Sequence, residues 1–286
     1  MGINFSKVAF TYNQQKKKER NRYVIKDIDL QISDTNEFIC ILGHTGSGKS
    51  TLVQMMNALL VPSLGEVNVD GNVITPKNQN NLKKVRKKVG LVFQFPEYQL
   101  FEETVLKDVS FGPKNFKLDN PEERAKQAMN LFKLGEKFYQ KNPFLLSGGE
   151  MRKVAISGIL ASDPEVLILD EPTVGLDPLT KQELVDLLKS INKDNNKTVI
   201  IVTHDMDVVW QVATRVIVID ENKIVYDGNK YDLFKNQELV KKHSLDIPEI
   251  VKILKDLKKR LNLDIDEYQD NLIDASNVIM EAMNHE

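Results

Sequence analysis

A glycine-rich segment early in the chain has the residue types and spacing needed to hold a nucleoside triphosphate. It matches the pattern G-x-x-x-x-G-K-[ST], and we expect every residue from its first glycine to the following threonine to bind the nucleotide: Gly43, His44, Thr45, Gly46, Ser47, Gly48, Lys49, Ser50 and Thr51. Glycines let successive backbone N–H groups turn inward towards phosphate oxygens. Lys49 adds a positive charge for the β- and γ-phosphates, and the Ser50 hydroxyl is a ligand for Mg²⁺. An apolar run precedes the segment and a helix is expected to follow, so a helix N-terminus also faces the anion.

Two carboxylates close another apolar run further along the chain. Residues 166–169 are Val-Leu-Ile-Leu, and Asp170 and Glu171 follow directly. Ligands gather at the carboxyl ends of strands in open parallel sheets, so Asp170 is expected to face the phosphate loop and hold Mg²⁺. Glu171 is expected to orient or deprotonate the attacking water. Taken alone, such a pair more often merely ends a strand, and only the phosphate loop favours the catalytic interpretation.

Two further polar residues end apolar runs in the same way. His204 follows residues 199–202, and a histidine there can contact the γ-phosphate or the water, although a lone histidine is more often structural. Gln94 follows residues 89–93, and its amide can reach Mg²⁺ or water. We therefore predict Glu171, His204 and Gln94 as catalytic residues, and Ser50, Gln94 and Asp170 as the Mg²⁺ ligands.

The elements that must position these residues follow an α/β pattern. Apolar runs typical of strands buried on both faces cover residues 38–42, 89–93, 166–169, 199–202 and 216–219, with helical patterns at 50–60, 182–192 and 206–213 between them. This alternation predicts a largely parallel central sheet. Residues 1–12 and 23–32 predict two more strands, joined by a basic loop over 13–22 that is expected to be a solvated hairpin tip.

Two regions depart from this alternation. Between residues 96 and 160 the chain reads as helical, with helices expected at 104–110, 121–134 and 150–160, and we interpret this region as an inserted helical subdomain. After residue 240, apolar residues at helical spacing from Ile247 to Leu261 predict one helix, and residues 267–283 a second. We therefore divide the chain into a domain over residues 1–240 and a C-terminal helical extension over 241–286.

The composition narrows the setting. The 286 residues carry a net charge of −2, which gives no global basic field for nucleic acid. No apolar run approaches the roughly 20 residues that span a bilayer, and the N-terminus does not fit a signal peptide. The single cysteine, Cys40, lies in an apolar run and is expected to be a buried thiol. These features point to the cytosol.

The order of the motifs resembles the ATP-binding cassette (ABC) family over roughly residues 1–235. Leu146-Ser147-Gly148-Gly149-Glu150 lies between Gln94 and Asp170, and Gly175-Leu176-Asp177-Pro178 follows. The resemblance implies a P-loop ATPase core with a mostly parallel sheet, an antiparallel β subdomain, an inserted helical subdomain and, here, a C-terminal helical extension. It implies ATP hydrolysis with Mg²⁺ by two cassettes that sandwich ATP.

The resemblance also assigns roles to particular residues. Ser147, Gly148 and Gly149 are expected to contact the ATP that the other cassette holds, since a helix start can donate to phosphate. Asp177 is expected at the dimer seam, and Tyr12 to stack on adenine. Family members commonly carry glutamine where this chain has Glu150. A carboxylate there repels phosphate, so we expect Glu150 to point away, and its presence leaves the activity of that site open.

Within the family, the chain looks like the energy-coupling factor subgroup and its second ATPase type. The resemblance rests on residues 93–105, Phe111-Gly112-Pro113 and residues 145–156. It implies an importer of vitamins or transition-metal ions, with this chain peripheral on the cytoplasmic face of the cell membrane. The implied partners are a paralogous second cassette in a heterodimer, a transmembrane coupling protein and a substrate-binding membrane protein, and no nucleic acid.

Two surfaces are assigned to these partners with an alternative left open. Glu97, Glu102 and Glu103 can receive arginines from the coupling protein, or can be a solvated acidic loop. The apolar stripe of the C-terminal helices must be buried on its own core or on another cassette, and we favour dimerisation.

Other function classes share part of the pattern. An ATPase of another ABC transporter class has every motif, and only residues 94–113 speak against it. A cassette acting on nucleic acid or the ribosome is disfavoured because no sustained heptads occur and one phosphate loop is present; the basic run at 83–88 is expected to be a solvated lead-in to a strand. A regulatory subunit that does not hydrolyse ATP is disfavoured by Glu171 and His204.

Overall fold

A central sheet organises the molecule. The computed structural model describes residues 2–13, 23–33, 36–194 and 196–284, so nearly all of the expected loop at 13–22 lies outside the described residues. Within those ranges the sheet has six strands in the order β10-β9-β3-β8-β7-β6. Their bounds are Phe38–Leu42 (β3), Val89–Val92 (β6), Val166–Asp170 (β7), Thr198–Val202 (β8), Arg215–Asp220 (β9) and Lys223–Gly228 (β10).

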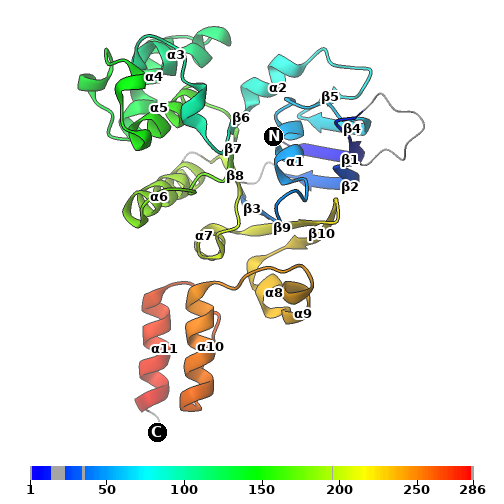
Figure 1. Cartoon of the computed structure of the whole chain (residues 1–286), viewed down its shortest axis with the longest axis vertical. Coiled ribbons are helices and arrows are strands. Elements are labelled where there is room, and N and C mark those ends of the chain that lie inside the picture. Colours follow the sequence, from blue (N-terminus) through cyan, green and yellow to red (C-terminus); the bar gives the residue numbers. More distant parts are fainter. Residues whose placement is uncertain (1, 14–22, 34–35, 195, 285–286) are drawn as a thin grey trace.

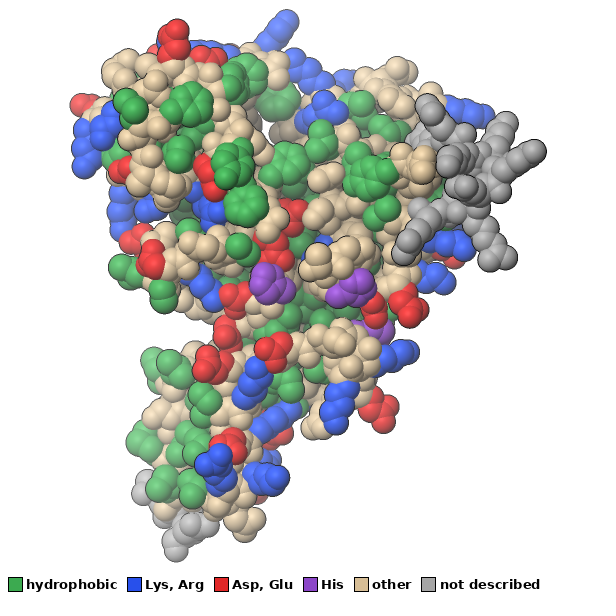
Figure 2. Space-filling view, in the orientation of Figure 1, with side chains coloured by type: hydrophobic (Ala, Val, Ile, Leu, Met, Phe, Trp, Pro, Cys, Tyr) green, Lys and Arg blue, Asp and Glu red, His purple; other side chains and the backbone are tan. Residues whose placement is uncertain are grey.

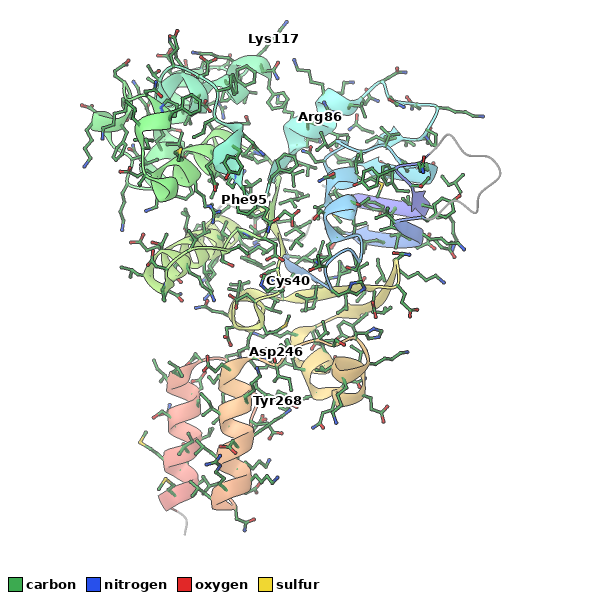
Figure 3. All side chains as sticks on the ribbon, in the orientation of Figure 1. Cys40, Arg86, Phe95, Lys117, Asp246 and Tyr268 are labelled. Carbon is green, nitrogen blue, oxygen red and sulfur yellow. The ribbon has the colours of Figure 1, made fainter. Side chains whose placement is uncertain are left out.

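The strands from β9 to β6 pair in parallel, and β10 adds an antiparallel edge. Every residue of β3, β6, β7 and β8 is buried, which explains their continuous apolar sequences. Cys40 lies within β3, where burial raises the pKa of its thiol, so the expected buried thiol is confirmed (Figure 3). Because the strands are parallel, their carboxyl ends share one edge.

A second, antiparallel sheet lies beside the first. Its order is β2-β1-β4-β5 in the described part of the chain. The strands are Ile3–Phe10 (β1), Ile25–Ile32 (β2), Leu64–Val69 (β4) and Asn72–Ile74 (β5). Apolar side chains from its inner face pack with helix α1 (Lys49–Met56) and with the central sheet in one core (Figure 1). This packing anchors the helix that follows the expected phosphate loop.

The inserted helical subdomain lies beyond β6 at the upper left of Figure 1. None of residues 96–160, all of which are described, lies in a strand. The elements are η1 (Pro96–Gln99), α3 (Val105–Asn115), α4 (Pro121–Leu131), η2 (Glu136–Phe138), η3 (Pro143–Leu145) and α5 (Gly148–Leu160). Helices α3, α4 and α5 share a core that continues into the one under the central sheet.

The remaining helices flank the sheet or extend from it. They are α2 (Leu82–Lys88), α6 (Pro178–Asp194), α7 (Met206–Val212), α8 (Lys230–Lys235), α9 (Gln237–Lys242), α10 (Glu249–Leu261) and α11 (Leu272–Asn284). Helices α10 and α11 form a hairpin at the lower end of the molecule (Figure 1). Leu254, Leu263, Ile265 and Ala275 are buried between them. Across the described ranges, no helix combines the length and the apolar character that crossing a membrane requires.

An aromatic cluster attaches this hairpin to the core. Trp210 of α7 meets Tyr231, Phe234 and Tyr268 at ring-centroid distances of 5.2, 5.7 and 6.3 Å (Tyr268 is labelled in Figure 3). Its indole N–H donates to the carbonyl of Gln269 at 2.8 Å. The segment around Tyr268 is therefore held against the core, and the last helix begins at Leu272 rather than at residue 267 as predicted.

Candidate nucleotide-binding and hydrolysis site

The expected phosphate loop connects β3 to α1 at the carboxyl edge of the central sheet. Gly43 and Gly48 have φ values of 144° and 105°, which side chains rarely adopt. A Cβ on Gly43 would lie 2.1 Å from the carbonyl oxygen of Ile219, and one on Gly48 would lie 2.4 Å from Ile25 Cγ2. Glycine is therefore required at both positions, and the loop rests against the end of β9 and the start of β2.

Lys49 points back across its own loop. Its ammonium donates to the carbonyls of Gly43 and His44 at 2.8 and 3.0 Å. Burial lowers the pKa of Lys49, while Glu171 and Asp170 act to raise it. The buried Ser47 hydroxyl has no hydrogen-bond partner among the described residues. A charged donor and an unsatisfied hydroxyl at one loop suit a phosphate group.

Ser50 and Asp170 meet at the proposed metal position. Asp170 ends β7 and is 8% exposed. Burial raises the pKa of Asp170, and a hydrogen bond from Ser50 opposes that shift. A hydroxyl beside a carboxylate matches the oxygen ligands that Mg²⁺ takes, so these residues fit that ion. Gln94 follows β6 with an exposed side chain, and no contact brings it to this pair, so its role as a ligand stays a prediction.

Glu171 and His204 form the pair expected to handle the water. The Nδ1 atom of His204 lies 3.0 Å from each carboxylate oxygen of Glu171. Glu171 has a φ of 50°, and its N–H donates to the carbonyl of Val202 at 2.8 Å. A left-handed backbone at a non-glycine residue is costly and clusters at functional sites. Histidine and acidic side chains gather at the centre of this face in Figure 2.

Tyr12 stands beside the helix that follows the loop. Its hydroxyl lies 3.2 Å from the Thr51 hydroxyl, and its ring meets Phe10 edge-on at 4.8 Å. The side chain is 65% exposed. The ring therefore lies beside the helix that follows the phosphate loop, and its stacking on adenine stays a prediction.

The residues of the Leu-Ser-Gly-Gly-Glu segment begin α5. Ser147 is the N-cap, and no heavy atom of the described residues lies within 4 Å of a Cβ added to Gly148 or Gly149. The Ser147 N–H and hydroxyl both donate to one carboxylate oxygen of Glu150 at 2.9 Å. These hydrogen bonds lower the pKa of Glu150. The expectation that Glu150 points away is wrong: its charge lies against Ser147 because it completes a capping box.

The position of the Glu150 carboxylate predicts that ATP turnover rises when its negative charge is removed. Glu150→Gln keeps a side chain that can complete the capping box but removes the negative charge beside the proposed phosphate contact. We expect about a three- to tenfold higher ATP turnover at the site whose ATP contacts Ser147, Gly148 and Gly149. The reason is that the substitution removes the repulsion between the Glu150 carboxylate and the phosphate. Phosphate release by the intact complex measures this, with Glu123→Gln, an exposed first-turn residue of α4, as the control. A lower rate in Glu150→Gln alone would show that the carboxylate assists.

Asp177 lies at the start of α6. Its carboxylate accepts from the N–H groups of Leu179 and Thr180 at 3.1 Å each and from the Thr180 hydroxyl at 2.6 Å. The Thr180 side chain is the main cause of a lowered pKa for Asp177. In the single chain, Asp177 therefore acts as a helix cap, and its place at a dimer seam stays a prediction.

Sequence reasoning missed Arg152 of α5. This arginine is 8% exposed and donates to the carbonyl of Val174 at 2.7 Å. It also lies 3.5 Å from both the carbonyl of Gln94 and the carboxylate of Glu97. Arg152 thus connects the signature helix, the loop after β6 and the segment beyond Glu171. Helical spacing alone cannot separate it from an exposed arginine.

Comparison with known proteins agrees with this geometry. The family described as ABC transporter matches residues 25–174. One curated relative is the energy-coupling factor transporter ATP-binding protein EcfA2 of Enterococcus faecalis, 48% identical over 87% of this chain and 86% of its own length. The Bacillus subtilis protein of the same name is 45% identical, over 89% of this chain and 93% of its own.

Solved structures give the same result. The chain is similar to cbiO1 from Clostridium perfringens, described as part of the ABC transporter complex cbiONQ, with a TM-score of 0.71, 33% identity and coverage of 91% and 95%. It is also similar to the cassette MJ0796, solved as a dimer in a post-hydrolysis state with ADP and Pi, with a TM-score of 0.70, 32% identity and coverage of 79% and 98%.

The phosphate loop, the paired strand-end carboxylates and these matches define the class: the chain belongs to the ABC transporter family of ATP-binding, ATP-hydrolysing proteins. Within that family it is an ATP-binding subunit of the energy-coupling factor type, of the second ATPase kind. The fold predicted from the sequence, the hydrolase activity and the subgroup are thereby confirmed.

Proposed function

We propose that this chain, as a peripheral subunit on the cytoplasmic face of the cell membrane, hydrolyses ATP to drive an importer of vitamins or transition-metal ions. The observation that carries the proposal is the contact of Glu171 with His204 at the sheet edge that also carries Ser50 and Asp170. This arrangement unites a water-activating group with a phosphate and metal site. Residues 1–240 supply this ATPase domain, and residues 241–286 form the helical extension.

ATP is held along the phosphate loop. Residues 43–51 bind its phosphates, with Lys49 at the β- and γ-phosphates, and Tyr12 stacks on adenine. Ser50, Asp170 and Gln94 hold Mg²⁺, which when bound offsets the charge of the phosphate oxygens. The contact between Ser50 and Asp170 and the loop geometry support this assignment.

Hydrolysis depends on Glu171. Its carboxylate takes a proton from the attacking water, and His204 holds the carboxylate in place from 3.0 Å. The left-handed backbone of Glu171 and the hydrogen bond from its N–H to the carbonyl of Val202 fix the backbone position from which the side chain extends. Positioning and charge stabilisation by the loop then lower the barrier.

A second, paralogous cassette completes the site. Ser147, Gly148 and Gly149 contact the ATP held by that partner, and Asp177 lies at the seam between the two. The uncovered glycines at the start of α5 support such a contact, since another molecule's phosphate can approach them. The similar cassette solved as a dimer supports the arrangement. Exposed apolar residues of the C-terminal hairpin, such as Ile273 and Met283, suit a role in dimerisation.

The transmembrane coupling protein binds the aromatic surface after β6. Phe95, Tyr98, Phe101 and Phe111 are each at least 45% exposed (Phe95 is labelled in Figure 3). Phe101 and Phe111 meet edge-on at 4.8 Å. Glu97 pairs with the buried Arg152, and Glu103 pairs with Lys107 in an exposed contact at 2.8 Å. An arginine of the coupling protein can compete for an exposed carboxylate more readily than for a buried one, so Glu102 and Glu103 are better placed than Glu97 to receive arginines. The substrate-binding membrane protein joins through this coupling protein.

Arg152 of α5 pairs with Glu97, which lies within the aromatic surface after β6. Movement of this aromatic surface is therefore mechanically linked to α5, whose N-terminus is proposed to contact ATP.

Nucleic acid gains no support from the basic run of α2. Arg86 donates to the carbonyl of Ala58 at 2.9 Å (labelled in Figure 3), and Lys88 pairs with Asp70 and Glu165. These contacts engage part of the basic charge within the chain, as expected for a lead-in to β6.

Affinity purification from detergent-solubilised native membranes, followed by mass spectrometry, tests the assembly. We expect a second cassette, one coupling protein and one or more small membrane proteins to co-purify with the chain. The double substitution of Tyr98 and Phe101 by serine should release the membrane proteins. The double substitution of Leu59 and Leu64 by serine is the control and should not release them, because these exposed leucines lie at the start of β4 and just before it. Recovery of ribosomes or DNA-bound proteins instead would contradict the transporter assignment.

A further inference from the structure

A carboxylate at the end of β9 lies between two histidines from distant parts of the chain. One oxygen of Asp220 is 3.1 Å from Nε2 of His44, in the phosphate loop. The other oxygen is 2.6 Å from Nδ1 of His243, which follows α9. The side chains of Asp220 and His243 are 17% and 9% exposed, whereas His44 is 56% exposed, so the half of the bridge towards His243 is buried and the half towards the phosphate loop is open to water. Neither Asp220 nor His243 has a role in the proposed hydrolysis.

Oxygen atoms lie against both ring nitrogens of His44. Its Nδ1 lies 2.8 Å from the carbonyl of Thr45, and its Nε2 lies 3.1 Å from the carboxylate of Asp220. The hydrogen bond from His243 is the main cause of a lowered pKa for Asp220. Asp220 is therefore held as a carboxylate between the two rings.

The phosphate loop has one further contact with this end of β9 and one internal contact that passes through His44. Gly43 packs so closely on Ile219 that an added Cβ would lie 2.1 Å from its carbonyl oxygen. The carbonyl of His44 also accepts from the Lys49 ammonium at 3.0 Å. The same residue that Asp220 holds by its ring therefore orients the lysine expected at the phosphates.

His243 connects the bridge to the C-terminal extension. It follows α9, whose Val240 is buried in the core, and precedes the short segment that leads into α10. In Figure 1, α8 and α9 lie below β9–β10, beside the upper end of the terminal hairpin. Asp246 in that segment is labelled in Figure 3 at the junction. Any shift of the extension at this junction therefore reaches His243.

We infer that Asp220 is a positioning residue that couples the phosphate loop, through His44, to the C-terminal extension, through His243. Nucleotide binding and the placement of the extension then influence each other, because such coupling is reciprocal. The inference rests on the proposal that residues 43–51 bind ATP. A bridge that only stabilises the fold would change the unfolding temperature and leave the affinity of the folded protein unaltered.

Titration of the full-length chain with a fluorescent ADP analogue in Mg²⁺ buffer tests this, since ADP keeps the β-phosphate and is not hydrolysed. We expect Asp220→Asn to raise the Kd about three- to tenfold, as for the loss of one partly exposed charge-assisted hydrogen bond. His243→Gln should raise it about two- to threefold, because it acts only through Asp220. Asp256→Asn, which removes an exposed partner of Arg260 within α10 and away from the junction, is the matched control and should leave the Kd unchanged.

A double-mutant cycle separates coupling from independent effects. If Asp220 acts through His44, the variant with both His44→Ala and Asp220→Asn should bind no more weakly than His44→Ala alone. Additive losses, or an Asp220→Asn protein that is folded by thermal unfolding and binds with wild-type Kd, would overturn the inference. If Asp220→Asn does not fold, a folded His243→Gln with wild-type Kd gives the same negative answer.

The Lys49→Ala variant distinguishes a failure of the phosphate-loop proposal from a failure of the coupling inference alone. If it binds ADP normally, the phosphate-loop proposal itself fails. If it loses ADP and Asp220→Asn does not change the Kd, only the coupling is contradicted.

Discussion

Replacing Glu171 with glutamine is expected to lower ATP hydrolysis at this chain's site by about 100-fold or more while ATP still binds, the usual scale of a general-base contribution. Glutamine keeps the shape and can still hydrogen-bond His204, which lies 3.0 Å from the carboxylate. It cannot accept the water's proton. The phosphate loop is untouched, so bound ATP should persist and, in the proposed dimer, the two cassettes should stay closed on it.

A photo-crosslinkable ATP analogue measures this at one site within the assembled complex. After incubation, the nucleotide attached to this chain should be the diphosphate in the wild type and the triphosphate in Glu171→Gln. Glu165→Gln, an exposed carboxylate at the opposite end of β7, serves as the matched control and should behave like the wild type. Diphosphate on the Glu171→Gln chain at the wild-type rate would show that another group activates the water.

Replacing Lys49 with alanine is expected to weaken nucleotide binding by about 100-fold or more. The ammonium is half-buried and donates to the carbonyls of Gly43 and His44, across the loop that is proposed to bind the phosphates. Hydrogen bonds to charged groups contribute about 1.5–3 kcal/mol each, and Lys49 is expected to make two of them to ATP. Loss of the side chain also removes the brace across the loop.

Titration with a fluorescent, non-hydrolysable ATP analogue measures the loss, with thermal unfolding to verify the fold. Lys26→Ala is the matched control, because Lys26 is exposed on β2 next to the residue that packs on Gly48. Its Kd should equal that of the wild type. A Lys49→Ala protein that binds the ATP analogue within about threefold of the wild type would contradict the loop assignment.

The strands that carry the site could be predicted because strands buried on both faces have continuous apolar sequences. Residues of β3 and β7 are buried on both faces, so their apolar runs stand out, and the carboxylates that end β7 follow. Strand β4 was not predicted, since only Val67 and Val69 of its residues are fully buried. The first helix ends at Met56 rather than residue 60, because Ala58 adopts a positive φ and the Asn57 side chain bonds the carbonyl of Val89.

The side-chain contacts of the site were less accessible. The orientation of Glu150 could have been found, since Ser147-x-x-Glu150 is the local pattern of a capping box. Arg152 and Asp220 could not, because the partners of Arg152 lie 20 to 58 residues away in the sequence and the histidine partners of Asp220 at least 23 residues away. Such contacts arise only when the sheet brings the ends of different strands to one edge, and spacing along a single element carries no trace of them.

The central claim, that ATP hydrolysis by this chain powers import, is tested most directly by uptake in cells that lack the chain. Radiolabelled vitamins and transition-metal ions are supplied to cells complemented with the wild type or with Glu171→Gln, expressed at equal levels. We predict that uptake of at least one of these cargoes returns with the wild type and stays at the level of the deletion strain with Glu171→Gln. Equal uptake of every cargo with both proteins would contradict the claim.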